Sequence, residues 1–175
     1  MNQTLISIFD IRGPKLLEIS NQTFSDEIIF GEFIDSCNFH KINFINCSFE
    51  ECEFLGATLH LCVFKNCIFN DTTIRKSDIA DCLFTNCQFI ESHLTPKTNF
   101  FRTVFRNSQF LIVDFSFSFL SECEFKESSL SKIKLQQTSI IDPKIKKTSF
   151  SELEFDENNP MRIRFTNSSS FPPEI

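Results

Sequence analysis

The chain has 175 residues and a mass of 20.4 kDa, which suits a single domain. Its formal net charge of −6 argues against general binding to nucleic-acid phosphates, because such binding needs positive charge. No apolar run approaches the ~20 residues of a membrane span, and the N-terminus lacks the basic start of a secretory signal.

The first 30 residues show no clear repeat. Gly31-Glu32-Phe33 then looks like a first repeating unit, with Phe33 six residues before Phe39. We expect residues 1–30 to form an N-terminal cap, because the open end of a repeat would expose its core and its unpaired strand edges.

From Phe39 to Phe155 a large apolar residue recurs every five residues, with a single six-residue step between Leu94 and Phe100. Of the 24 Phe, 15 lie on this series, which chance does not produce at 41% apolar content. The position two residues before each centre is mostly small. Each unit therefore offers one small and one large side chain to a core. All eight cysteines occupy the small position: Cys37, Cys47, Cys52, Cys62, Cys67, Cys82, Cys87 and Cys123.

A period of five fits neither an α-helix nor a simple β-strand. It fits a chain that turns a corner every five residues, so that four corners close a coil of about 20 residues and coils stack at ~4.8 Å. A 20-residue superperiod supports this geometry, because Asn46, Asn66, Asn86 and Asn107 share one column. Asn tolerates turn conformations, so we expect this column at a corner.

The pattern Cys/Ser/Thr-x-Phe-x-x, over about residues 37–155, resembles the repeat of the pentapeptide-repeat proteins, whose consensus is Ala-(Asp/Asn)-Leu-x-x. The resemblance implies an all-β fold, a right-handed quadrilateral β-helix of about six or seven coils. We expect this pentapeptide-repeat solenoid over residues 31–157. Residues 158–175 are then expected to form a C-terminal cap or tail, because Asn158-Asn159-Pro160 is a loop signal, although Met161–Phe165 could add one strand.

The eight cysteines are interpreted as core thiols. Zinc sites usually use short pairs such as Cys-x2-Cys, whereas the close pairs here, such as Cys47 and Cys52, are five positions apart. All eight cysteines instead share one position of the repeat, and each behaves as a small buried hydrophobe. Keeping so many thiols reduced predicts a cytoplasmic location.

His40 and His60 lie 20 positions apart, each just after a centre, so they should face outward one coil apart. Two stacked imidazoles could bind a metal. No third ligand is evident, and we therefore interpret both as ordinary surface histidines. His93 lies on another face.

The sequence contains no catalytic constellation, neither GxSxG, nor a P-loop, nor GxGxxG. A rod of stacked coils also offers no obvious cleft. We therefore predict that the chain is not an enzyme and uses neither a cofactor nor a metal.

Two outward features are candidates for partner binding. The first is acidic, since Glu51, Asp71 and Glu91 share one corner column and Glu50 and Glu53 flank its start. Residues 1–100 carry 7 basic and 13 acidic side chains, so all of the net charge lies in this half. The column is either a solvated corner that aids solubility or a surface that imitates the phosphates of DNA.

The second feature is apolar. Phe101 and Phe119 should be near neighbours on one face, with Phe117 at an adjoining corner. Exposed Phe suggests a contact surface, unless the caps or the tail cover it. Homodimerisation through this cluster or through a rod end is a further possibility.

Three functions are consistent with these features. The resemblance extends to the Qnr-type quinolone-resistance proteins, which are dimeric rods that act on DNA gyrase and topoisomerase IV and carry projecting loops. This chain has only the Thr95-Pro96-Lys97 slip and no dimerising helix. The alternatives are a protein-interaction scaffold, such as a bacterial effector or an immunity protein, and a purely structural rod. The prediction is a non-catalytic protein-binding rod without direct nucleic-acid or membrane binding.

Overall fold

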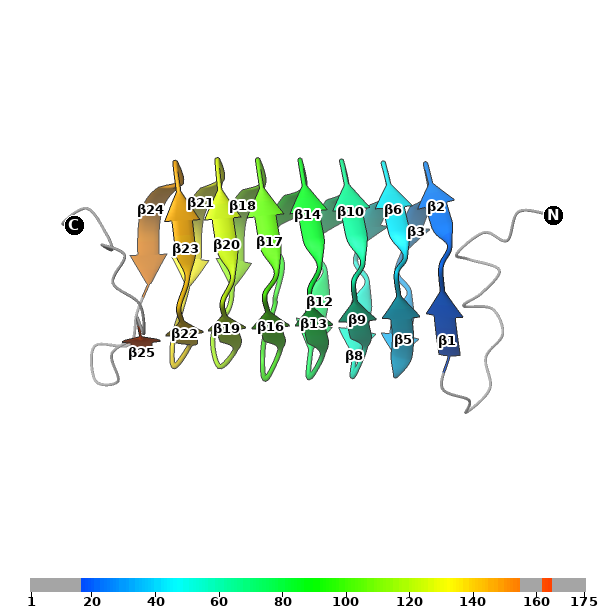
Figure 1. Cartoon of the computed structure of the whole chain (residues 1–175), viewed down its shortest axis with the longest axis horizontal. Coiled ribbons are helices and arrows are strands. Elements are labelled where there is room, and N and C mark those ends of the chain that lie inside the picture. Colours follow the sequence, from blue (N-terminus) through cyan, green and yellow to red (C-terminus); the bar gives the residue numbers. More distant parts are fainter. Residues whose placement is uncertain (1–16, 155–161, 165–175) are drawn as a thin grey trace.

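The computed structural model describes residues 17–154 and 162–164, and the regular elements in them are all β-strands (Figure 1). The strands form four parallel sheets, which we call the first to fourth faces. Along each face, a strand pairs with the strand one coil before it and the strand one coil after it, so the sheets run along the long axis of the rod.

The first face consists of β1 (Leu17–Ser20), β5 (Cys37–His40), β9 (Thr58–His60), β13 (Asp78–Ala80), β16 (Asn99–Phe101), β19 (Phe119–Ser121), β22 (Ser139–Ile141) and β25 (Arg162–Arg164). The second face consists of β2 (Thr23–Ser25), β6 (Asn43–Ile45), β10 (Val63–Lys65), β14 (Leu83–Thr85), β17 (Val104–Arg106), β20 (Glu124–Lys126) and β23 (Lys144–Lys146).

The third face consists of β3 (Ile28–Phe30), β7 (Ser48–Glu50), β11 (Ile68–Asn70), β15 (Gln88–Ile90), β18 (Gln109–Asp114), β21 (Ser129–Lys134) and β24 (Ser149–Glu154). The fourth face consists of β4 (Phe33–Asp35), β8 (Glu53–Leu55) and β12 (Thr73–Arg75). Beyond β12 this face continues through bridges from Thr73 to His93 and from His93 to Asp114.

The described residues therefore form a parallel β-solenoid of about seven coils, because the second and third faces each contain seven strands. The four-sided all-β fold predicted from the five-residue period is confirmed. Register is exact over the repeat, since Phe44, Phe64, Phe84, Phe105 and Phe125 are Cα partners in successive strands of the second face.

The large inward side chains stack into aromatic ladders. Ring centroids are 4.5 Å apart between Phe64 and Phe84, and 5.0 Å apart between Phe84 and Phe105. On the third face the rings of Phe69 and Phe89 are 4.7 Å apart and within 4° of parallel. These residues are all buried, so the ladders form the continuous core of the rod.

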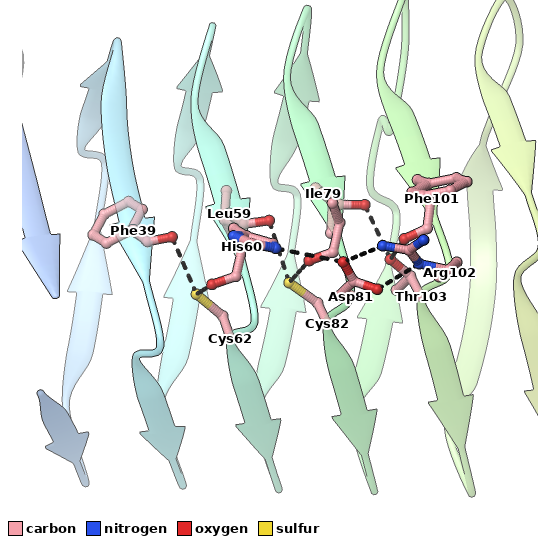
Figure 2. A network of polar contacts seen from close by, with 11 residues as sticks. Phe39, Leu59, His60, Cys62, Ile79, Asp81, Cys82, Phe101, Arg102 and Thr103 are labelled. Carbon is pink, nitrogen blue, oxygen red and sulfur yellow. Dashed lines mark hydrogen bonds and ion pairs between the residues drawn. The ribbon is translucent and has the colours of Figure 1, made fainter. Parts of the chain in front are cut away.

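The small inward residues bond adjacent coils together. The Cys82 thiol lies 3.4 Å from the carbonyl oxygens of both Ala80 and Leu59, the latter in the preceding coil (Figure 2). The Ser92 hydroxyl makes the same pair of contacts at 2.9 and 3.1 Å. The Ser77 hydroxyl also accepts a hydrogen bond from the backbone N–H of Ala57, one coil earlier. All eight cysteines are free and buried, which confirms their assignment to the core.

Corners are formed two residues after each inward centre, except at the slip, where Lys97 lies three residues after Leu94. In the described residues, 25 non-glycine residues there have positive φ, and Gly31 and Gly56 occupy equivalent positions. Asn46, Asn66, Asn86 and Asn107 lie at one such corner, as predicted, with φ between 48° and 55°. Their side-chain amides donate along the column at 2.8–3.0 Å, and the first of them donates to the carboxylate of Asp26.

The extra residue at Thr95-Pro96-Lys97 is absorbed at a corner. The Thr95–Pro96 peptide is cis, and Lys97 takes the positive φ of the corner position. Thr95 Oγ1 donates to the carbonyl oxygen of Ser116 in the next coil. The parallel pairing resumes in register immediately afterwards, so the slip leaves the stack intact.

The start of the repeat differs from the prediction. Phe33 is not an inward centre, because it is 54% exposed while Ile34 is 1% exposed. The five-residue step continues back through Ile29, Phe24 and Ile19, and β1, β2 and β3 stack on the next coil. Residues 17–30 are therefore part of the coil stack, and no structural boundary lies at residue 31. The rest of the expected N-terminal cap, residues 1–16, lies outside the described residues.

At the other end, β25 pairs with β22 as the additional strand that the sequence suggested. The remainder of the expected cap or tail, residues 158–161 and 165–175, lies outside the described residues. In the ranges that the structure describes, no helix is long and apolar enough to cross a membrane.

Replacement of Phe84 by Ala should lower the free energy of unfolding by about 3–5 kcal/mol, because it removes a large side chain from the middle of a buried ladder. Phe119→Ala is the matched control, since Phe119 is 51% exposed. Denaturant unfolding of both variants measures the difference. Equal loss of stability in the two would contradict the register.

The native thiols should react slowly with a thiol reagent, because every cysteine side chain is buried. All eight should react once the protein is unfolded in denaturant. The measurement is the number of thiols labelled over time with and without denaturant. Rapid labelling of most thiols in the native protein is the result that would refute their placement in the core.

Stability should also fall at alkaline pH. Burial raises the pKa of Cys123 to about 12 and that of Cys37 to about 11. A thiol with a raised folded pKa stabilises the fold fully below its unfolded pKa of about 8.5, and this contribution is lost as the pH rises through the folded value. Denaturant midpoints at about pH 8 and pH 10.5 should show a smaller loss in Cys123→Ser than in the native chain. An identical loss would mean that this thiol does not contribute.

Candidate protein-binding surfaces

The acidic corner consists of Glu51, Asp71 and Glu91, which lie at the corner between the third and fourth faces. Each has a positive φ, of 54°, 47° and 49°. Each backbone N–H donates to a carbonyl one coil further on, at 2.9–3.0 Å. These bonds fix the corner backbone, so the three exposed carboxylates project in one line, spaced at ~4.8 Å.

The three carboxylates of the acidic corner make no ion pair or hydrogen bond within the described part of the chain. The flanking carboxylates differ. Glu50 accepts a hydrogen bond from Ser48 at 2.8 Å, and Glu53 pairs with Arg75. The predicted flanks are therefore half-buried and already engaged, and the unpaired charge is confined to the corner itself.

The predicted Phe cluster is only partly brought together. Phe101 lies on β16 and is half-buried, and the guanidinium of Arg102 lies 4.2 Å from the centre of its ring. Phe119, on the neighbouring strand β19, pairs with Asn99, two residues before Phe101. Phe119 and Phe117 are 51% and 46% exposed. The exposed apolar surface is therefore formed by these two residues, and Phe101 is covered by its neighbour.

Sequence reasoning missed a second apolar cluster, which we call the apolar foot. It consists of Ile28, Phe30 and Phe33, which are 66%, 60% and 54% exposed. They surround the corner at Gly31, which lies one coil before Glu51 in the same corner column. Extending the five-residue step back from Phe39 to Ile34 would have revealed it, since that step turns Phe33 outward.

A polar network lies near the corner between the first and second faces (Figure 2). His60 Nε2 is 3.4 Å from Asp81 Oδ2. Arg102 donates to both carboxylate oxygens of Asp81, at 2.7 Å each, and its guanidinium holds the pKa of that carboxyl below its usual value. The rings of His40 and His60 lie side by side and are tilted relative to each other, with ring centroids 5.1 Å apart. Within the described ranges, no group of three or more His, Cys, Asp or Glu is placed to hold a metal ion.

The family model described as pentapeptide repeats matches the chain in 8 copies, with residues 35–66 matched. Among solved structures, a trypsin-treated form of QnrB1, a plasmid-mediated fluoroquinolone resistance protein, is 14% identical. That match covers 82% of this chain and 93% of the trypsin-treated chain, with a TM-score of 0.29. HetL, a pentapeptide-repeat protein involved in heterocyst differentiation regulation from the cyanobacterium Nostoc sp. strain PCC 7120, is 8% identical. Coverage there is 87% of this chain and 95% of HetL, with a TM-score of 0.27.

No curated protein matches the sequence. The two structural likenesses are too low in identity and in TM-score to say anything about the activity of this chain. The repeated family match agrees with the five-residue step that the coils follow, with one slip, from β1 to β24. The chain is accordingly a member of the pentapeptide-repeat family, in a form rich in Phe and Cys.

Proposed function

We propose that the chain is a non-catalytic rod that binds a protein partner along its acidic corner, and that this partner is a type II topoisomerase such as DNA gyrase. The observation that carries the proposal is the line of three exposed, unpaired carboxylates at Glu51, Asp71 and Glu91. A groove that normally holds DNA is lined with positive charge, and this corner offers it a straight row of negative charge.

The density of charge limits the mimicry. Duplex DNA presents one negative charge per ~1.7 Å of axis, whereas the corner presents one per coil, at ~4.8 Å. Glu50 and Glu53 do not raise this density much, because both are half-buried and engaged with Ser48 and Arg75. The role of the acidic corner is therefore to speed and orient the encounter.

Apolar contact supplies the remaining affinity in this proposal. The apolar foot of Ile28, Phe30 and Phe33 lies at one end of the acidic corner, and Ile112, which is 43% exposed, follows Glu91 at the other. Phe is one of the aromatic residue types that are enriched in protein interfaces. A partner would then contact both the charged line and its apolar end.

Simultaneous charge reversal at Glu51, Asp71 and Glu91 to Lys should abolish binding without unfolding the rod, because the three side chains point outward. Lys is already accepted at equivalent corners, as at Lys41 and Lys76. The assay is DNA supercoiling by gyrase, with and without a fluoroquinolone, over a range of protein concentrations. Any effect of the native chain should weaken with added salt.

The control variant reverses Glu18, Glu122 and Glu127, which are also exposed and change the net charge equally. It should keep the activity of the native chain. If the native chain neither inhibits nor protects gyrase at concentrations of tens of micromolar, gyrase is excluded as the partner. The chain would then be a binding scaffold for a different protein.

A further inference from the structure

Two histidines on adjacent strands of the first face form a preorganised pair. His40 ends β5 and His60 ends β9, and their Cα atoms are partners in the parallel register. Their ring centroids are 5.1 Å apart and the rings are inclined by 41°. Both side chains are half-buried at the surface of the rod, so the pair is accessible while its backbone is held by the stacked coils.

The surroundings of His60 select one nitrogen as a ligand. His60 Nε2 lies 3.4 Å from Asp81 Oδ2, and two bonds from Arg102 at 2.7 Å fix that carboxylate (Figure 2). When Nε2–H donates to Asp81, the lone pair of the neutral imidazole lies on Nδ1. Histidines that bind metals usually donate their other ring N–H to a carboxylate in this manner.

We propose that His40 and His60 together bind one divalent first-row transition ion between two coils, with Asp81 as the outer carboxylate that orients His60. Two imidazoles that each hold an ion at ~2.0–2.1 Å have ring centres roughly 5 Å apart when the angle at the ion is near tetrahedral. The observed separation of 5.1 Å agrees with this geometry. In this proposal Asp81 orients His60 from outside the coordination shell, since its Oδ2 faces His60 Nε2 and both of its oxygens accept bonds from Arg102.

The protein supplies two ligands to this site and water completes the coordination. This agrees with the finding that no group of three or more candidate ligands occurs in the described ranges. Imidazole favours Cu²⁺, Ni²⁺ and Zn²⁺ over Mg²⁺ and Ca²⁺. The thiol of Cys62 does not contribute, since it is buried and contacts the carbonyl oxygens of Phe39 and His60.

Calorimetric titration of the full chain, without a histidine tag, with Ni²⁺ near neutral pH tests the proposal. The native chain should bind one ion, and His40→Gln and His60→Gln should each abolish that binding. His93→Gln is the matched control, because His93 is exposed on the fourth face and should leave binding unchanged. Asp81→Asn should weaken binding about 10–100-fold, as loss of an outer carboxylate does.

Two further measurements separate binding from folding. Ni²⁺ should raise the thermal midpoint of the native chain and of His93→Gln, but not of His60→Gln, because the pair exists only when the coils are stacked. In the native chain, paramagnetic Ni²⁺ should broaden the imidazole signals of His40 and His60 and spare those of His93. Equal broadening of all three, or equal loss of binding in His93→Gln and His60→Gln, would overturn the site. Native affinity in Asp81→Asn would overturn the role of Asp81.

Discussion

The fold depends on a single backbone constraint, the left-handed conformation that the chain takes every fifth residue. Left-handed backbone costs a non-glycine residue on the order of 1–2 kcal/mol, and 25 of the described corner residues have it. Most corner residues from Asn21 to Glu127 donate their backbone N–H to a carbonyl oxygen of the next coil, as Glu51 does to Asn70 and Asp71 to Ile90, both at 3.0 Å. Because these bonds join one coil to the next, no coil is expected to be stable alone, and stability arises from stacking.

The same constraint explains why Cys, Ser and Thr exchange at the small position. After a corner, a Cys, Ser or Thr at the small position brings a side-chain donor close to two carbonyl oxygens, as Cys82, Ser92 and Thr72 all do. The hydroxyl of Ser77 in turn accepts the N–H of Ala57, a group that would otherwise be buried without a partner. Where Cys, Ser or Thr occupies the position, the residue therefore combines small size with hydrogen bonding.

The sequence predicted the four-sided coil, the buried thiols and the Asn corner because all three follow from counting in fives and twenties. The prediction failed at Phe33, where Glu32 and Glu27 replace small residues and hide the register of the first coil. Consequently the apolar foot was missed, since its residues look like core residues out of step. The contact of His60 with Asp81 was also missed, because it joins a face position to a corner position 21 residues later.

A rod of this kind can vary its surface without disturbing its core, since the outward positions form columns that the inward pair does not constrain. The corner column that holds Glu51, Asp71 and Glu91 begins with Gly31 and continues as Ile112. Charge therefore changes to apolar surface within one coil, at no cost to the register. Recognition by such a protein is set by which columns carry which chemistry and over how many coils. The acidic corner is short and covers three coils. A partner that binds it must therefore also contact the residues at its ends.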